Sequence, residues 1–139
     1  SYVNKMSIKG NLISYEEMAG QAYDLYYVVT DILDDVKEDE ARFDNLLNII
    51  SKMFFQYKDI ATSKEYLVRG IDLWSKLGYT DDSKDVYTFK ALFGLIALLS
   101  DEANRDANKA TVNFDEVFAE DKVNLDSVFI AALKKFYQF

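Results

Sequence analysis

One apolar stretch, residues 86–99, constrains the fold of this chain more than any other. It reads VYTFKALFGLIALL, and Lys90 is its single charged residue. As a helix it is apolar on every side, and a helix of that kind is buried in the protein interior. It is shorter than the roughly 20 residues that a helix needs to cross a bilayer. We therefore predict an all-α bundle whose buried central helix spans about 84–100.

The residues that interrupt helices are scarce in the rest of the chain. Proline is absent, and glycine occurs only 5 times in 139 residues. Little therefore supports an all-β fold built on tight turns, and the length suits one domain. We expect a single-domain helical bundle over residues 1–139, with five main helices and one short helix. Residues 1–12 show no periodicity and are interpreted as an N-terminal arm.

The first helix begins with a capping box formed by Ser14 and Glu17. Apolar residues then recur at intervals of three and four, which is the spacing of a narrow stripe that packs on a neighbouring helix. This stripe contains Tyr15, Met18, Ala22, Leu25, Val29, Ile32 and Val36. The opposite side of the same helix is almost entirely acidic.

Further helices follow after short connections. Apolar residues at helical spacing predict a second helix over 43–57, ending near 58–60, and a third over 62–78 with a second capping box. Asp82 or Ser83 is expected to cap the central helix, which can continue past Leu99. A final amphipathic helix is predicted over 125–136.

Two segments near the C-terminus resemble each other. NFDEVF at 113–118 and NLDSVF at 124–129 each begin with asparagine and carry an acid in the next three residues. We interpret both as helix starts capped by Asn113 and Asn124, since asparagine is a favoured N-cap residue. An internal duplication is the alternative interpretation.

The absent residue types exclude several kinds of site. Without cysteine the chain forms no disulfide, thiol nucleophile or cysteine zinc site, and without histidine it lacks the commonest general base. Asp34, Asp35 and Glu38 form a DDxxE run similar to the magnesium-binding acids of isoprenoid synthases, but no second acidic motif accompanies it. We assign no catalytic residue, no metal ligand and no cofactor.

The net charge of −8 is distributed unevenly. The whole imbalance lies between Ser14 and Glu40, where Lys37 is the single base, while the other residues balance. Direct binding to nucleic acid needs clustered lysine and arginine and is not expected. The first residues contain neither an apolar signal core nor a lipidation motif, so we expect a cytoplasmic protein without a membrane partner.

The acidic side of the first helix is the candidate binding site. Like charges one turn apart repel by a few tenths of a kcal/mol per pair, and a basic partner converts this repulsion into attraction. A tyrosine within the acidic row also suits a protein interface. The predicted partner-binding residues are Asp24, Tyr27, Asp31, Asp34, Asp35 and Glu38.

The expected function is a small acidic binding protein, of the inhibitor or immunity-protein type, which docks this side on a basic protein surface. The partner could be a nucleic-acid-binding protein, and the chain a phage or bacterial accessory protein. Two alternatives stay open. One is a divalent-metal-dependent helical enzyme that acts on a phosphorylated substrate, and the other is a subunit that self-assembles through the apolar stripe of its first helix. The acids could also serve only to keep the surface solvated.

Overall fold

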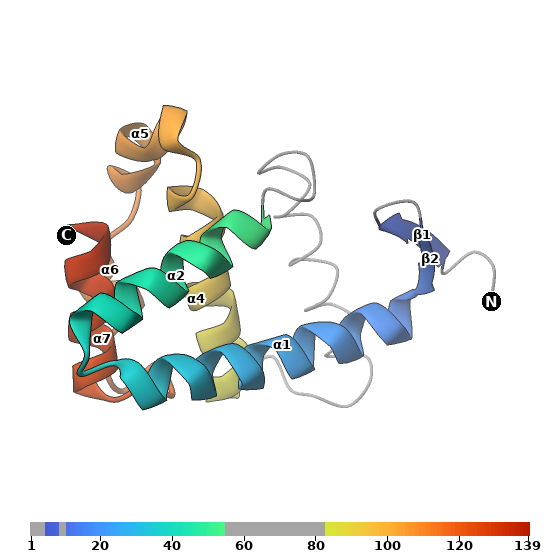
Figure 1. Cartoon of the computed structure of the whole chain (residues 1–139), viewed down its shortest axis with the longest axis horizontal. Coiled ribbons are helices and arrows are strands. Elements are labelled where there is room, and N and C mark those ends of the chain that lie inside the picture. Colours follow the sequence, from blue (N-terminus) through green and yellow to red (C-terminus); the bar gives the residue numbers. More distant parts are fainter. Residues whose placement is uncertain (1–4, 9–10, 55–82) are drawn as a thin grey trace.

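The computed structural model describes residues 5–8, 11–54 and 83–139, and the side chains of 24–52 and 83–139. These residues are predominantly helical, which confirms the predicted all-α class (Figure 1). The third predicted helix, over 62–78, lies outside the described residues. The described elements, in order, are β1 (Lys5–Ile8), β2 (Asn11–Ser14), α1 (Tyr15–Val36), α2 (Glu40–Phe54), α4 (Lys84–Leu99), η3 (Glu102–Asn104), α5 (Arg105–Lys109), α6 (Phe114–Val117) and α7 (Ser127–Tyr137).

The N-terminal arm contains a short β-hairpin. Strands β1 and β2 pair in antiparallel fashion, with Met6 opposite Ile13. The residues of β1, KMSI, alternate polar and apolar, whereas those of β2, NLIS, do not, so the interpretation of residues 1–12 as an arm without periodicity missed this hairpin. Helix α1 begins at Tyr15, directly after Ser14, where the capping box predicted its start. The hairpin lies at the N-terminal end of α1, away from the other described elements (Figure 1).

Helix α4 is the buried centre of the fold, as predicted. Its buried residues cover more than half of the helix surface, while the remaining side is half-buried at Tyr87, Ala91, Gly94 and Leu98 and exposed at Lys90. The N-cap is Ser83, whose hydroxyl accepts a hydrogen bond of 3.1 Å from the backbone N–H of Val86. Burial of its large aromatic and aliphatic side chains supplies much of the free energy that stabilises the bundle.

The helix ends at Leu99 because the chain turns back and satisfies its last carbonyl groups. Arg105 Nε donates to the carbonyl of Leu99 at 2.8 Å, and Asn108 Nδ2 donates to that of Leu98 at 2.9 Å. These carbonyls have no partner within the helix itself. The polar residues that follow therefore form the separate elements η3 and α5 and do not continue α4.

Helices α1, α2 and α7 pack with α4 around one core. The α2 residues Phe43, Leu47 and Ile50 are buried. The Phe43 ring meets Phe129 of α7 edge to face, with centroids 5.6 Å apart. This geometry is favourable for aromatic pairs and joins the second helix to the last.

The apolar stripe of α1 differs in part from the prediction. Val29 and Val36 are buried as expected, but Ile32 is 43% exposed and the neighbouring Leu33 is fully buried. The buried side is formed by Tyr26, Val29, Leu33 and Val36. The prediction that Ile32 belongs to the packed stripe was wrong. Spacing alone does not distinguish the two sets, since the buried residues also recur at intervals of three and four. Packing decides between the two sets: Tyr26 lies against Phe89 of α4, with ring centroids 6.1 Å apart.

The two similar segments near the C-terminus are used differently. Asn113 caps α6 as predicted and accepts a hydrogen bond of 3.3 Å from the N–H of Glu116. The predicted cap at Asn124 was wrong: α7 begins at Ser127 and is capped by Asp126, which accepts from the N–H of Phe129 at 2.9 Å. Asn124 is held by α4 instead, since its backbone N–H donates to Thr88 Oγ1 at 2.7 Å.

Among the helices described, none has the length and hydrophobicity required to cross a bilayer.

Candidate functional site

The predicted binding residues lie on α1 and in the turn after it. Asp24, Asp31, Asp34, Asp35 and Glu38 are exposed, and Tyr27 is half-buried. The structure divides these six residues into two groups. Tyr27 forms a hydrogen bond to α4 and Asp34 an ion pair with Lys37, whereas the remaining four carboxylates are exposed.

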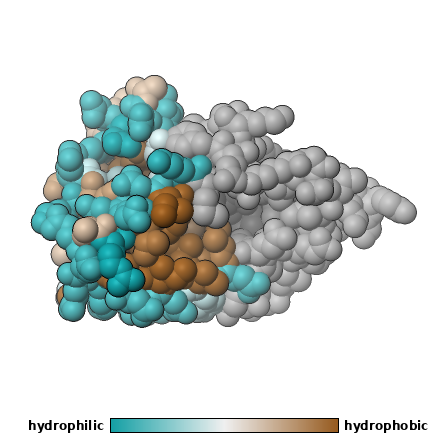
Figure 2. Space-filling view, viewed as in Figure 1, coloured by the Kyte–Doolittle hydropathy of each residue, from teal (hydrophilic) through white to brown (hydrophobic). Residues whose placement is uncertain are grey.

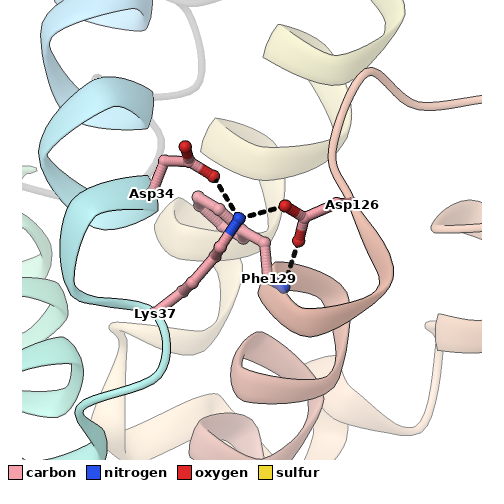
Figure 3. A network of polar contacts seen from close by, with 4 residues as sticks. All are labelled: Asp34, Lys37, Asp126 and Phe129. Carbon is pink, nitrogen blue, oxygen red and sulfur yellow. Dashed lines mark hydrogen bonds and ion pairs between the residues drawn. The ribbon is translucent and has the colours of Figure 1, made fainter.

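Asp34 belongs to a network that joins α1 to α7 (Figure 3). Lys37 Nζ donates to Asp34 Oδ1 at 2.7 Å and also forms an ion pair with Asp126, the N-cap of α7. The hydrogen bond from Lys37, followed by that from the N–H of Phe129, lowers the pKa of Asp126. The hydrogen bond to Asp126 in turn raises the pKa of Lys37. Lys37, the single base of the acidic segment, is therefore used inside the molecule.

Tyr27 belongs to a polar junction between α1 and α4. Its hydroxyl donates to Asp85 Oδ2 at 2.8 Å, and Asn124 Nδ2 donates to Asp85 Oδ1 at 2.8 Å. The hydroxyl of buried Tyr26 lies 3.5 Å from the same Oδ1. Burial, reinforced by the negative charge of Asp85, raises the pKa of Tyr26 to about 12.

Asp85, Asn124 and Asp126 were not predicted as partners of the acidic side. Asp85 precedes the apolar stretch and Asn124 is far from α1 in the chain, so no spacing rule connects them with Tyr27. The tyrosines themselves were the only signal in the sequence, because a buried tyrosine hydroxyl usually finds a hydrogen-bond partner.

The other four carboxylates form a row that is not neutralised. We call Asp24, Asp31, Asp35 and Glu38 the carboxylate row. No lysine or arginine of the described part of the chain forms an ion pair with them, although Lys134 pairs with Asp115 at 2.8 Å and Lys135 with Glu40 at 2.9 Å. The folded protein thus retains an unbalanced negative charge along one side of α1.

An apolar patch lies beside the carboxylate row. Val28 and Ile32 of α1 and Ile49 of α2 are 55%, 43% and 48% exposed. Figure 2 shows apolar surface gathered on the face that α1 and α2 form together. Contiguous exposed apolar surface of this kind marks interaction sites in soluble proteins. We call Val28, Ile32 and Ile49 the apolar patch.

Carboxylates also line an open hollow of about 540 Å³ between α1, the start of α4 and the segment before α7. Asp31, Asp34 and Asp126 lie on its wall together with Lys84. Within the described ranges, no three or more acidic side chains are grouped so that they could hold a metal ion. The hypothesis of a metal-dependent enzyme therefore gains no support from these residues.

A second hollow of about 340 Å³ lies where α2, α4 and α7 end. The hydroxyls of Ser51, Ser100 and Tyr137 lie on its wall and form no hydrogen bond with the residues that the structure describes. Burial raises the pKa of Tyr137 to about 12. Lys52 and Arg105 face this hollow together with Glu102 and the carbonyl ends of α4 and α7, so its charges do not select one class of ligand.

Comparison of the chain with protein-family models, with curated proteins and with solved structures finds no match in any of the three.

Proposed function

We propose that this is a binding protein that docks its carboxylate row on a basic surface of another protein. The observation that carries the proposal is that Asp24, Asp31, Asp35 and Glu38 are exposed together and are not neutralised by a described cation. Lysine and arginine side chains of a partner would relieve their mutual repulsion. The long-range field of the row would also steer the partner and accelerate association.

Tyr27 and Asp34 have a positioning role in this proposal. Tyr27 binds α1 to Asp85 at the start of α4, and Asp34 binds Lys37, which reaches Asp126 at the start of α7. These contacts hold α1 rigid, so the carboxylates need little ordering when a partner binds. Such preorganisation increases affinity without adding contacts.

The partner class follows from the charge. A rigid acidic helix presents carboxylates in a row, as a nucleic-acid backbone presents phosphates, and a protein surface that binds phosphates is rich in lysine and arginine. The function that fits is an inhibitor or immunity-type protein that covers such a surface.

The test is affinity capture from a lysate of the source cells at low and moderate salt. The bait variant is Asp31→Lys with Glu38→Lys, and the matched control is Asp106→Lys with Asp121→Lys, which changes the net charge equally at exposed positions of other segments. Asp34 is kept because it takes part in the Lys37 network. We expect the native bait and the control to retain the same basic protein, the variant to lose it, and salt to release it.

Equal retention by the native bait and the Asp31/Glu38 variant would contradict the proposal and leave the row as a solvated surface. Equal loss by the variant and the control would contradict it too, since binding would then depend on net charge and not on this side of α1. Retention that salt does not weaken would argue against an electrostatic contact.

A further inference from the structure

The apolar patch carries a second inference, because the charges at its two edges are opposite in sign. On α1, Asp24 lies one turn before Val28, and Asp35 lies one turn after Ile32. On α2, Lys52 lies one turn after Ile49, and Arg42 lies two turns before it. All four charged side chains are exposed, and no described residue forms an ion pair with any of them.

The antiparallel arrangement of α1 and α2 places these charges at matching positions along the two helices. The two helices run in opposite directions on either side of the turn at 37–39. Asp24 and Lys52 are equally far from this turn along their helices, and Asp35 and Arg42 both lie close to it. Val28 and Ile49 lie at nearly the same height between these pairs. The patch therefore has an acidic edge on α1 and a basic edge on α2, with matching positions along both.

A surface of this kind is complementary to itself. Consider a two-fold axis that runs parallel to α1 and α2. Rotation about this axis places α1 of one copy against α2 of the other and leaves the position of every residue along the helix axis unchanged. Each Asp24 then faces Lys52 of the second copy, each Asp35 faces Arg42, and Val28 and Ile32 cover Ile49. The four helices meet as neighbouring antiparallel pairs, which is an ordinary packing for helical bundles.

We propose that the apolar patch is the interface of a symmetric homodimer. A uniformly basic partner fits this patch less well, since Arg42 and Lys52 would repel it. The same two residues favour a second copy of the chain, which brings carboxylates to that edge. In the dimer Asp24 and Asp35 face the second copy, whereas the partner test above changes Asp31 and Glu38, which the tests of the dimer leave unchanged.

The interface contains few large apolar side chains, so the dimer is expected to be weak, with a dissociation constant of roughly micromolar order. Sedimentation velocity on the purified full chain, at concentrations from well below to well above that value, measures it directly. The native protein should shift from its monomer mass of 16.0 kDa to twice that mass as the concentration rises.

Ile32→Glu tests the apolar contact. A buried unpaired carboxylate should weaken dimerisation by at least tenfold, while circular dichroism shows unchanged helicity because residue 32 is exposed in the monomer. The matched control is Val128→Glu on α7, also an exposed apolar residue, at 39%. The control should dimerise like the native protein.

A charge exchange tests the orientation even if Ile32→Glu fails to fold. Asp24→Lys alone and Lys52→Asp alone should each weaken the dimer, and the double variant Asp24→Lys with Lys52→Asp should restore it. The proposal is overturned if the native protein stays monomeric throughout, if Ile32→Glu dimerises like the native protein, or if the double variant is no stronger than the single ones. Since no partner is present, the result does not depend on the proposed function.

Discussion

Helices α1 and α4 contain similar kinds of apolar residues, but these residues are distributed differently around each helix, and this difference determines how each one packs. Helix α4 has no extended polar side, and the structure buries most of it, leaving only the side that carries Tyr87, Lys90 and Leu98 half-buried or exposed. Helix α1 has a wide apolar arc next to an acidic side, and it can pack on its neighbours through more than one set of residues. The structure buries one set and leaves Val28 and Ile32 at the surface. A helix that is only partly buried therefore has residues left for contacts outside the fold.

The ends of the two helices differ in the same way. Helix α4 is held by Ser83 at its start and by Arg105 and Asn108 at its end. The C-terminal end of α1 is held by Lys37, Asp34 and Asp126, with the two aspartates at the surface. Surface ion pairs are weaker and respond to salt and pH, so α1 is the more sensitive of the two helices to solution conditions.

The largest effect is expected from Phe93→Ala in α4. Phe93 is fully buried and packs on Phe89 with ring centroids 4.9 Å apart, so truncation should lower the free energy of unfolding by about 3–5 kcal/mol. Urea unfolding measures this loss. Lys90→Ala in the same helix is the control and should change stability by less than about 0.5 kcal/mol, because residue 90 is exposed. Similar losses for the two variants would show that the side of α4 that carries Phe93 is no better buried than the side that carries Lys90.

The next effect separates the two candidate stripes of α1. Leu33→Ala should lower the free energy of unfolding by about 2–5 kcal/mol, since Leu33 is fully buried. Ile32→Ala should lower it by less than about 1 kcal/mol, because Ile32 is largely at the surface already. The pair is measured by urea unfolding at a concentration at which the protein is monomeric. A larger loss for Ile32→Ala would favour the stripe predicted from the sequence.

A smaller effect is expected where α1 and α4 meet. Asp85→Ala removes the acceptor of the Tyr27 hydroxyl and a partner of Asn124, and should lower the free energy of unfolding by about 1–3 kcal/mol. Asp85→Asn retains one oxygen acceptor and should be less harmful. Thermal unfolding of the two variants compares them. If Asp85→Ala were as stable as the native protein, the junction would not hold the two helices together.

The smallest effect concerns pH. The pKa of Asp126 is lowered in the folded protein, chiefly by Lys37, so its ionised form contributes stability above its unfolded pKa near 3.8, and this contribution is lost as the pH falls through the lower folded value. Asp126→Asn keeps an N-cap acceptor but removes the charge. We expect this variant to lose less stability than the native protein between about pH 5 and pH 2.

Denaturant unfolding across this pH range provides the measurement. Asp115→Asn is the matched control, since Asp115 forms an ion pair with Lys134 but caps no helix. Identical pH profiles for Asp126→Asn and the native protein would show that the Lys37 ion pair does not stabilise the contact between α1 and α7.

Local rules predicted much of this fold from particular residues. The capping box at Ser14 located the start of α1, Ser83 was one of two predicted caps of α4, and Asn113 was the predicted cap of α6. In the candidate site, the same rules placed the five acids at the surface. They did not reveal that Lys37, the partner of Asp34, also reaches Asp126 at the start of α7, or that Tyr27 donates to Asp85 of α4, since these residues are distant in the chain.

The sequence by itself determined the helical class, the burial of most of residues 86–99 and the concentration of negative charge on α1, because these depend on side-chain periodicity and charge within one segment. Only the tertiary structure decided which of Ile32 and Leu33 is buried and that Asp126 and not Asn124 caps α7. It also decided which carboxylates stay unpaired. These outcomes depend on contacts between distant segments, and the packing energy of α4 against its neighbours selects one of several arrangements that are locally equivalent.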